Sequence, residues 1–424
     1  MTGITTIAAP QNIEDLGVRQ SFIEDLALKH IYLGGELMVD KLAAQLRLSF
    51  KVVNNIYDSL RRAELCEVKG AKGIGATRQG RARALELLTH NQYCGPTPVP
   101  LKDYVDRVRA QSVKNFPVRL ALVERAFEHL VLPSRTLKRL AAAVISGTSI
   151  FLYGPTGTGK TSIAEGIPNI YHDLVWIPHA VEADGQIIAV FDPVIHRPEE
   201  NPEAADCDRR WVLCRRPRVV VGGELAAEML DLQFHPVSKF YAAPPQMKAN
   251  NGVLVVDDFG RQRIRPEELL NRWTVPLDRR IDFLTFLGGR TFEIPFDLFV
   301  VFATNLDPAQ LADEAFLRRV SNKIKLDNLN REQFHRVFER LCKPLGLECD
   351  RSVVDDLMDH LTTEWKQPLR PCYPQDLLNH VLWTAQCDDR APRLDREALA
   401  EACHSYFLAP ESSGATTLHT GGDV

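Results

Sequence analysis

Residues 154–161 combine glycine, lysine and threonine in an order suited to binding phosphate. The segment reads Gly154-Pro155-Thr156-Gly157-Thr158-Gly159-Lys160-Thr161 and follows the apolar run Ser149–Tyr153. Glycines allow a backbone to wrap around a phosphate with its N–H groups pointing inward. In such a loop Lys160 reaches the β- and γ-phosphates, and the Thr161 hydroxyl coordinates Mg²⁺. The spacing therefore predicts a nucleotide-binding loop between a buried strand and a helix.

Two carboxylates follow a second apolar run about a hundred residues later. Gly252–Val256 is unbroken and ends at Asp257 and Asp258. A carboxylate at the carboxyl end of a parallel strand lies where ligands and metal ions bind in an open α/β sheet. We expect Asp257 to hold Mg²⁺ and Asp258 to orient or deprotonate the attacking water. These residues predict hydrolysis of a nucleoside triphosphate.

A third apolar run, Phe299–Thr304, ends at the amide Asn305, and the pair Arg318-Arg319 ends a short helical segment shortly afterwards. The complete order resembles an AAA+ ATPase, with Walker A, Walker B, sensor 1 and a paired arginine. The resemblance covers about residues 115–408. It implies that Asn305 is sensor 1, and that Arg318 or Arg319 is an arginine finger donated to the nucleotide of a neighbouring subunit.

The stretch before Asn305 resembles one branch of that family. Residues 282–287 and 290–294 are predicted to form two strands joined by Gly288-Gly289, similar to the hairpin of MoxR-type ATPases. Two positions depart from the family pattern. Asp258 stands where glutamate is usual, and Gln375 stands at the sensor 2 position of the helical lid, where arginine is frequent. Gln375 would therefore contact the nucleotide as a neutral amide.

The first 90 residues have a different pattern. Helices are expected near 22–34, 39–46 and 50–60, the last with Ser49 as its N-cap, followed by a hairpin with a glycine-rich tip and a further helix near 80–88. This order resembles a winged helix-turn-helix domain. Between Lys41 and Arg83 there are ten Lys/Arg and three Asp/Glu, an excess of seven positive charges. The candidate DNA contacts are Lys51, Asn54, Asn55, Lys69 and Lys72. A protein-docking module is the alternative.

The whole chain has 424 residues and a formal net charge of -4, with 45% hydrophobic and 25% charged residues. These values exclude collagen, coiled-coil and fully disordered classes, and no apolar run is long enough for a membrane span. Nine scattered cysteines without a CxxC pair indicate reduced thiols in a cytoplasmic protein. The cluster Arg209, Arg210, Arg215, Arg216 and Arg218 is interpreted as solvated surface.

The predicted fold is α/β: a P-loop AAA+ parallel sheet with a C-terminal helical lid and an N-terminal winged helix-turn-helix. The expected boundaries are a flexible leader (1–20), a winged-helix-like domain (21–90), a linker (91–114), an ATPase core (115–326), a helical lid (327–408) and a disordered tail (409–424).

Three functions are compatible with these features. The first is an ATPase that uses ATP and Mg²⁺, as a homo-oligomer (by resemblance a hexameric ring), to remodel a protein partner in a MoxR-like chaperone role. The second is a DNA-bound regulator or loader that grips DNA with its N-terminal domain. The third is a slow-turnover ATP switch, suggested by the short carboxylate of Asp258 and by the neutral Gln375.

Overall fold

The apolar runs form a central five-stranded sheet. Its order is β16-β4-β15-β12-β9, and the pairs β4–β15, β15–β12 and β12–β9 are parallel. The strands are β4 (Ser149–Tyr153), β9 (Arg218–Val221), β12 (Val253–Val256), β15 (Phe299–Thr304) and β16 (Asn322–Lys325). Every side chain of β12 and β15 is buried, which is the environment that continuous apolar strands require. Since β12 and β15 are adjacent and parallel, the polar residues that follow them meet at one edge of the sheet.

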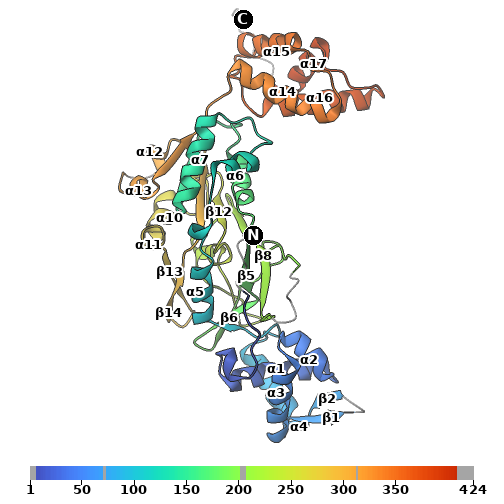
Figure 1. The fold of residues 1–424 in the computed structure, drawn as a ribbon, viewed down its shortest axis with the longest axis vertical. Coiled ribbons are helices and arrows are strands. Elements are labelled where there is room, and N and C mark those ends of the chain that lie inside the picture. The colour runs from blue at the N-terminus through green and yellow to red at the C-terminus, as the bar shows by residue number, and fades with distance from the viewer. Residues whose placement is uncertain (1–5, 70–72, 201–206, 312–313, 408–424) are drawn as a thin grey trace, which may run out of the picture. The chain divides into compact units, whose positions relative to one another are not determined.

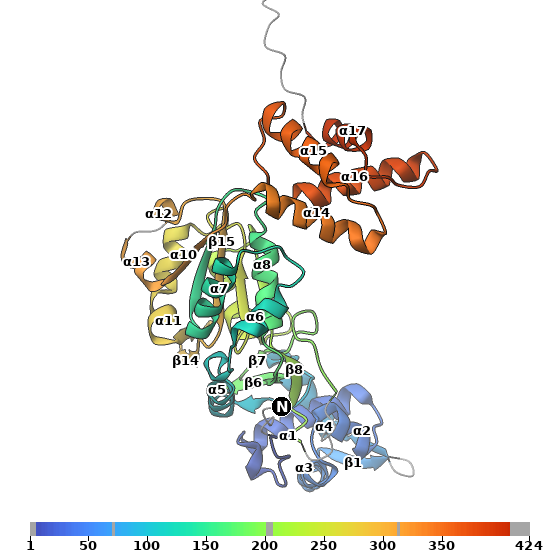
Figure 2. The same ribbon diagram turned by 45° about the horizontal axis from the view of Figure 1, so that its top comes forward.

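Helices cover this sheet. Side chains of β12 and β15 share one core with α10 (Pro266–Arg272), where Trp273 and Phe302 pack together. The helix α7 (Ser134–Ser146) contacts β4 and lies along the sheet in both ribbon views (Figures 1 and 2). The remaining α-helices between residues 120 and 319 are α6 (Leu120–Ala126), α8 (Lys160–Gly166), α9 (Pro245–Lys248), α11 (Thr274–Arg279), α12 (Pro308–Leu311) and α13 (Glu314–Arg319). With the glycine loop that directly follows β4, this parallel sheet has the α/β fold of P-loop NTPases.

A second five-stranded sheet has the order β10-β11-β7-β6-β3. Its strands are β3 (Val99–Pro100), β6 (Ala180–Ala183), β7 (Gln186–Ala189), β10 (Gln233–Phe234) and β11 (Tyr241–Ala242). Two further antiparallel pairs are β5 (Leu174–Pro178) with the distant strand β8 (Trp211–Arg215), and the hairpin of β13 (Ile281–Thr285) with β14 (Thr291–Pro295). The hairpin predicted around Gly288-Gly289 is thereby confirmed.

The N-terminal elements follow the predicted order of three helices, a hairpin and a fourth helix. They are α1 (Gln20–Gly34), α2 (Val39–Leu46), α3 (Phe50–Arg62), β1 (Cys66–Lys69), β2 (Gly73–Ala76) and α4 (Arg78–His90). The Ser49 hydroxyl accepts the amide of Val52, which confirms the predicted N-cap of α3. These helices share an apolar core that also includes Ala180 and Ile187 of the second sheet.

The segments predicted as a flexible leader and as a linker are both partly packed. Part of the leader (1–20) is packed: Leu16 is fully buried, and its carbonyl accepts a hydrogen bond from Arg210. The linker (91–114) contains β3, which pairs with β6, and α5 (Leu101–Ala110), whose Tyr104 is buried. Both segments are polar enough to look like loops, but their few apolar side chains enter cores built from distant parts of the chain.

The last four helices belong to a compact unit whose residues contact one another more than they contact the rest of the chain. This unit also contains residues 128–132 and 154–160. They are α14 (Arg331–Leu345), α15 (Arg351–Thr363), α16 (Tyr373–Cys387) and α17 (Arg396–Tyr406). A capping box between Asn330 and Gln333 starts α14. Phe334, Met358 and Leu377 belong to the shared core of this helical C-terminal region.

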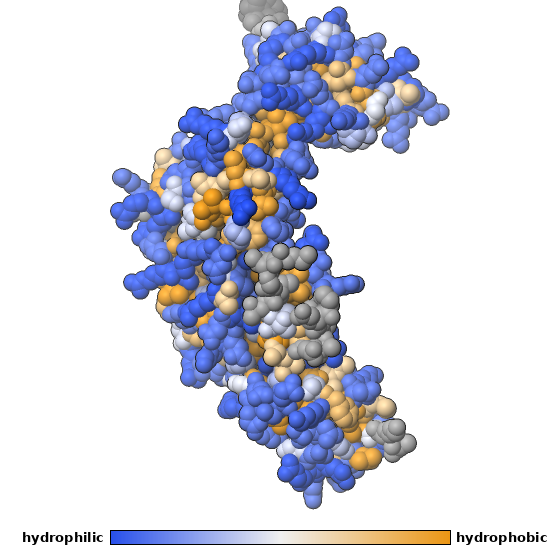
Figure 3. Space-filling view, in the orientation of Figure 1, coloured by the Kyte–Doolittle hydropathy of each residue, from blue (hydrophilic) through white to orange (hydrophobic). Residues whose placement is uncertain are grey.

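The computed structural model describes residues 6–69, 73–200, 207–311 and 314–407. None of the helices in these ranges combines the length and the apolar character that crossing a membrane requires. Hydrophilic side chains cover most of the molecular face in Figure 3.

Candidate functional site

The loop after β4 depends on glycine at three positions. Gly154, Gly157 and Gly159 have φ values of 141°, 80° and 84°, a region that residues with a Cβ rarely adopt. A Cβ at Gly154 would also lie 2.1 Å from the Leu326 carbonyl oxygen. The predicted loop therefore forms because glycine adopts these positive φ values, which other residues rarely do.

Lys160 lies inside this loop. Its side chain is 7% exposed, and its Nζ donates to the carbonyls of Gly154 (2.9 Å) and Pro155 (2.7 Å). An ammonium held by the carbonyls of a phosphate-binding loop lies where a phosphate would find its counter-charge. Thr158 braces the same turn, since its hydroxyl donates to the Pro155 carbonyl at 2.8 Å.

The next residue, Thr161, meets the acidic strand end. Its Oγ1 lies 3.0 Å from Oδ2 of Asp257, which follows β12 directly. Hydroxyl and carboxylate oxygens suit Mg²⁺, which is commonly bound by one or two protein groups together with substrate phosphates. Within the described ranges, no group of three or more His, Cys, Asp or Glu side chains could hold a metal by itself. Thr161 and Asp257 thus fit an ion that arrives with a nucleotide.

Asp258 and Asn305 are brought together at the same edge of the sheet. Asn305 Nδ2 donates to Asp258 Oδ1 at 3.3 Å, although the two residues are 47 positions apart. The backbone of Asp258 is left-handed, with φ of 48°, which turns the chain sharply after β12. Two bonds between the acidic turn and β15 fix this turn: Phe259 N to the Ala303 carbonyl, and Thr304 Oγ1 to the Phe259 carbonyl.

Sequence reasoning missed Gln262, which holds the acidic turn from the other side. Its Nε2 donates to the Asp257 carbonyl at 2.7 Å, and its Oε1 accepts the Gly260 amide at 2.8 Å. The amide thus closes the turn that carries both carboxylates. A polar residue a few positions after an acidic turn is a weak signal, because many surface glutamines have the same spacing.

The paired arginines differ in their surroundings. Arg319 is 26% exposed and forms an ion pair with Asp278 at 2.9 Å. Arg318 is exposed, and in the described part of the chain its guanidinium has no ion-pair partner. An exposed, unpaired guanidinium is available to another molecule, whereas Arg319 is already bound within its own chain.

The predicted sensor 2 residue is turned toward its own helix. Gln375 is exposed in the first turn of α16, and its Nε2 donates to Asn379 Oδ1 at 3.0 Å. The residue that lies against the glycine loop in this unit is instead Arg370, five positions earlier, which sequence reasoning also missed. A Cβ built on Gly157 would lie 3.5 Å from Arg370 Cδ.

Cys372 also touches the loop. Its backbone N–H donates to the Gly157 carbonyl at 3.2 Å, and its Sγ would lie 2.6 Å from a Cβ at Gly157. Burial, with the neighbouring Asp376 adding to it, raises the pKa of the Cys372 thiol. The thiol therefore stays neutral and adds no negative charge next to the loop.

The candidate DNA contacts belong to the N-terminal helices and the β1–β2 hairpin. Lys51 and Asn55 are exposed near the start of α3, while the Asn54 amide donates to Asp58 at 3.1 Å on the same helix. Lys69 ends β1, and Lys72 lies outside the described residues. The structure thus leaves Lys51 and Asn55 accessible and engages Asn54 within its own helix.

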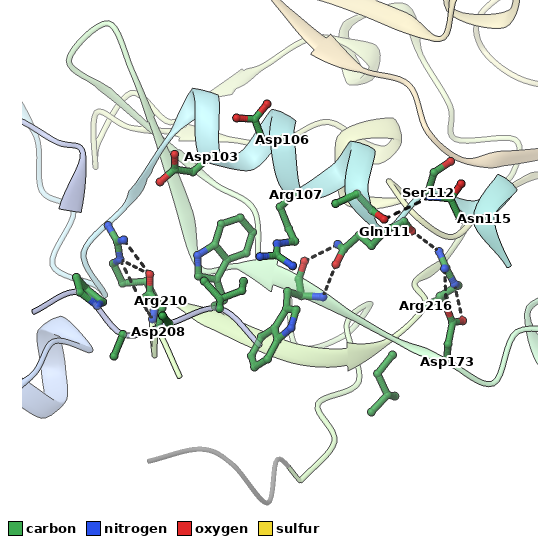
Figure 4. Close-up of a pocket in the computed structure, with 18 of the residues that line it drawn as sticks. Asp103, Asp106, Arg107, Gln111, Ser112, Asn115, Asp173, Asp208, Arg210 and Arg216 are labelled. Atoms are coloured by element: carbon green, nitrogen blue, oxygen red, sulfur yellow. Dashed lines mark hydrogen bonds and ion pairs between the residues drawn. The ribbon is translucent and has the colours of Figure 1, made fainter. Parts of the chain in front are cut away.

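The interpretation of the arginine cluster as solvated surface is wrong for two of its members. Arg210 and Arg216 are each 3% exposed on the side chain and pair with Asp208 and Asp173. Figure 4 shows both pairs in the wall of a cavity of about 850 Å³ beside α5. Arg216 also donates to the carbonyls of Gln111 (3.0 Å) and Asn251 (2.7 Å). These bonds use most of the donors in both guanidiniums, so the pairs hold the wall together.

Comparisons with known proteins find a family model that matches the C-terminal helices and distant likenesses among solved structures. Residues 330–405 match a family model described as a domain of unknown function (DUF8689). No curated protein matches the sequence. Among solved structures, a RuvB variant from Thermotoga maritima is 12% identical and covers 70% of this chain and 72% of its own, with a TM-score of 0.37.

A second Thermotoga maritima structure, titled as the RuvB Holliday junction branch migration motor, is 11% identical. It covers 65% of this chain and 69% of its own, again with a TM-score of 0.37.

Proposed function

We propose that this chain is an AAA+ ATPase that hydrolyses ATP with Mg²⁺ and uses the energy to remodel or assemble a protein partner. The observation that carries the proposal is the pairing of Thr161 with Asp257 and of Asn305 with Asp258 at one edge of the sheet. Thr161 directly follows the glycine loop, so the phosphate-binding turn leads into a hydroxyl–carboxylate pair. A Mg²⁺ ion bound there would polarise the phosphate oxygens and neutralise their charge.

In this proposal the residues act on the substrate and on water. Lys160 exchanges its loop carbonyls for phosphate oxygens. Asp258 accepts a hydrogen bond from the attacking water, and the Asn305 amide keeps that carboxylate in place. Gln262 and Thr304 hold the turn and act only as positioning residues.

The exposed Arg318 supports an oligomeric working form. Arg319 is paired with Asp278 in its own subunit, so we assign the arginine finger to Arg318, acting on the nucleotide of an adjacent subunit. A hexameric ring is the assembly that the family resemblance implies. All nine cysteines are free thiols, which supports a reducing, cytoplasmic environment.

The experiment that tests the ATPase compares phosphate release and ATP affinity for the parent, Lys160→Ala and Asp258→Asn. We expect Lys160→Ala to lose ATP binding, and Asp258→Asn to bind ATP without turnover and to retain its protein client in a pull-down. Lys343→Ala, on the exposed face of α14, is the matched lysine control and should behave as the parent. Unchanged turnover in Lys160→Ala would overturn the assignment.

Slow turnover is a second candidate for the same site. The Asp258 carboxylate is one methylene shorter than glutamate, and misplacement by about 1 Å reduces rates by about 10²-fold. If Asp258→Glu raises turnover by tenfold or more with ATP affinity unchanged, the parent is a slow-turnover switch. A rate that stays equal or falls favours the remodelling ATPase.

DNA binding through a winged-helix N-terminal domain is the third candidate, supported by the exposed Lys51 and Asn55 and by the β1–β2 hairpin. Duplex DNA binding by the full chain should then weaken steeply with salt and should drop in Lys51→Ala, but not in Lys343→Ala. Absence of binding at low salt would assign these helices to protein docking.

A further inference from the structure

The segment just before α16 runs against the glycine loop. Cys372 N–H donates to the Gly157 carbonyl at 3.2 Å, and the positions that a Cβ on Gly157 would meet are Cys372 Sγ and Arg370 Cδ. All of these residues belong to one contact unit, which joins residues 154–160 with 325–424. The aliphatic stem of Arg370 is therefore held at the loop that is proposed to bind phosphate.

The guanidinium of Arg370 has donors to spare. Its Nε is buried and forms no hydrogen bond, and across the described ranges neither a carboxylate nor a carbonyl pairs with its other nitrogens. Its Cζ lies 5.6 Å from the ring centroid of Tyr373, so a cation–π contact steadies the head group without using its N–H donors. Leaving the N–H donors of a half-buried guanidinium without an acceptor costs free energy, so an acceptor supplied by a ligand would bind here favourably.

Because the residue at the predicted sensor 2 position is neutral, the positive charge of Arg370 is not duplicated there. Gln375 uses its amide within α16, on Asn379, and brings no charge to the loop. Arg370 is the cation that this unit places at Gly157, in addition to Lys160 inside the loop.

We propose that Arg370 binds a phosphate group of the nucleotide held by residues 154–160, a contact that the neutral Gln375 cannot make as a cation. This inference rests on the proposed function, since it needs a nucleotide in the loop. A guanidinium offers paired donors with the geometry of phosphate oxygens and keeps its charge at every physiological pH. Its contact with bound phosphate would connect the start of α16 to the occupancy of the loop.

The test measures ATP and ADP affinity by calorimetry for the parent, Arg370→Gln, Arg370→Lys and Lys160→Ala. Loss of one charge-assisted hydrogen-bond pair predicts affinity for ATP about 10- to 100-fold weaker in Arg370→Gln. Arg370→Lys retains the charge and should recover part of the loss. Arg390→Gln, an exposed arginine of the same unit paired with Asp388, is the matched control and should bind as the parent.

The outcomes distinguish the role of Arg370 from the proposed ATPase function. If the parent binds no nucleotide, both are overturned. If the parent binds ATP and Lys160→Ala does not, but Arg370→Gln matches the parent, only the role of Arg370 is overturned. Equal losses in Arg370→Gln and Arg370→Lys, together with a lowered melting temperature, would show a purely structural arginine and would also overturn it.

Discussion

Four arginines of this chain form two groups that the sequence does not distinguish. Arg210 and Arg216 are buried, and each is bound to an aspartate and to backbone carbonyls. Arg318 and Arg370 have no such partner within the described ranges. Burying a guanidinium requires that its donors be filled internally, so the first group can only support the fold. The second group has donors left for a nucleotide or for another subunit.

The largest effect that would sharpen this comparison is expected at Arg318. Removal of an arginine finger lowers turnover by about 10³- to 10⁵-fold, so Arg318→Ala should nearly abolish phosphate release while its melting temperature and ATP affinity stay unchanged. Mixing Arg318→Ala with Asp258→Asn subunits should restore part of the rate, because each supplies what the other lacks. A rate that stays at the parent level would place Arg318 among ordinary surface residues.

Arg216 should show the opposite behaviour. Arg216→Ala leaves the partly buried Asp173 and two backbone carbonyls without their donor, which is expected to cost about 3–5 kcal/mol of unfolding free energy. Urea denaturation measures this loss. Arg218→Ala, on the exposed neighbour two positions on, is the control and should cost less than about 1 kcal/mol. Equal losses in the two variants would break the comparison.

His179 extends the comparison to a half-buried histidine that is influenced by the cation of Arg47. Burial, with a smaller contribution from Arg47, lowers the pKa of His179 from 6.5 to about 4. Because the unfolded chain binds this proton more readily, stability is fully present above pH 6.5 and is lost as the pH falls toward 4. His179→Asn should flatten this part of the stability curve. An unchanged slope would mean that His179 is already charged in the folded protein.

Arg319 is expected to show the smallest effect. It is partly exposed and paired with an aspartate that is itself 46% exposed, so Arg319→Ala should change the unfolding free energy by less than about 1 kcal/mol. Turnover should stay within a few-fold of the parent if Arg318 is the finger. A loss of turnover as large as that of Arg318→Ala would exchange the two assignments.

Local patterns predicted the parts of the fold that depend on local chemistry. The apolar runs became β4, β12 and β15, and Ser49 capped α3, because strand burial and helix capping are set by residues near in sequence. The parallel sheet then brought Asp258 to Asn305 across 47 positions, as strands of this kind require.

The failures all involve long-range contacts. The leader looked like a loop because the partner of Leu16 is Arg210, 194 positions away. Arg210 and Arg216 were interpreted as solvated because nothing in the sequence marks Asp208 and Asp173 as their partners. Only the folded chain brings the two pairs together. Arg370 was passed over in favour of Gln375, since its approach to Gly157 depends on how the segment before α16 packs and on no recognisable motif.

The left-handed backbone of Asp258 also bears on how this chain balances durability against activity. A residue with a side chain is strained at a φ of 48°, whereas glycine tolerates that angle. Asp258→Gly should therefore relieve about 1 kcal/mol of backbone strain while removing the carboxylate that we propose orients the attacking water. If Asp258 acts as proposed, the substitution that makes this turn more stable would also make the protein inactive.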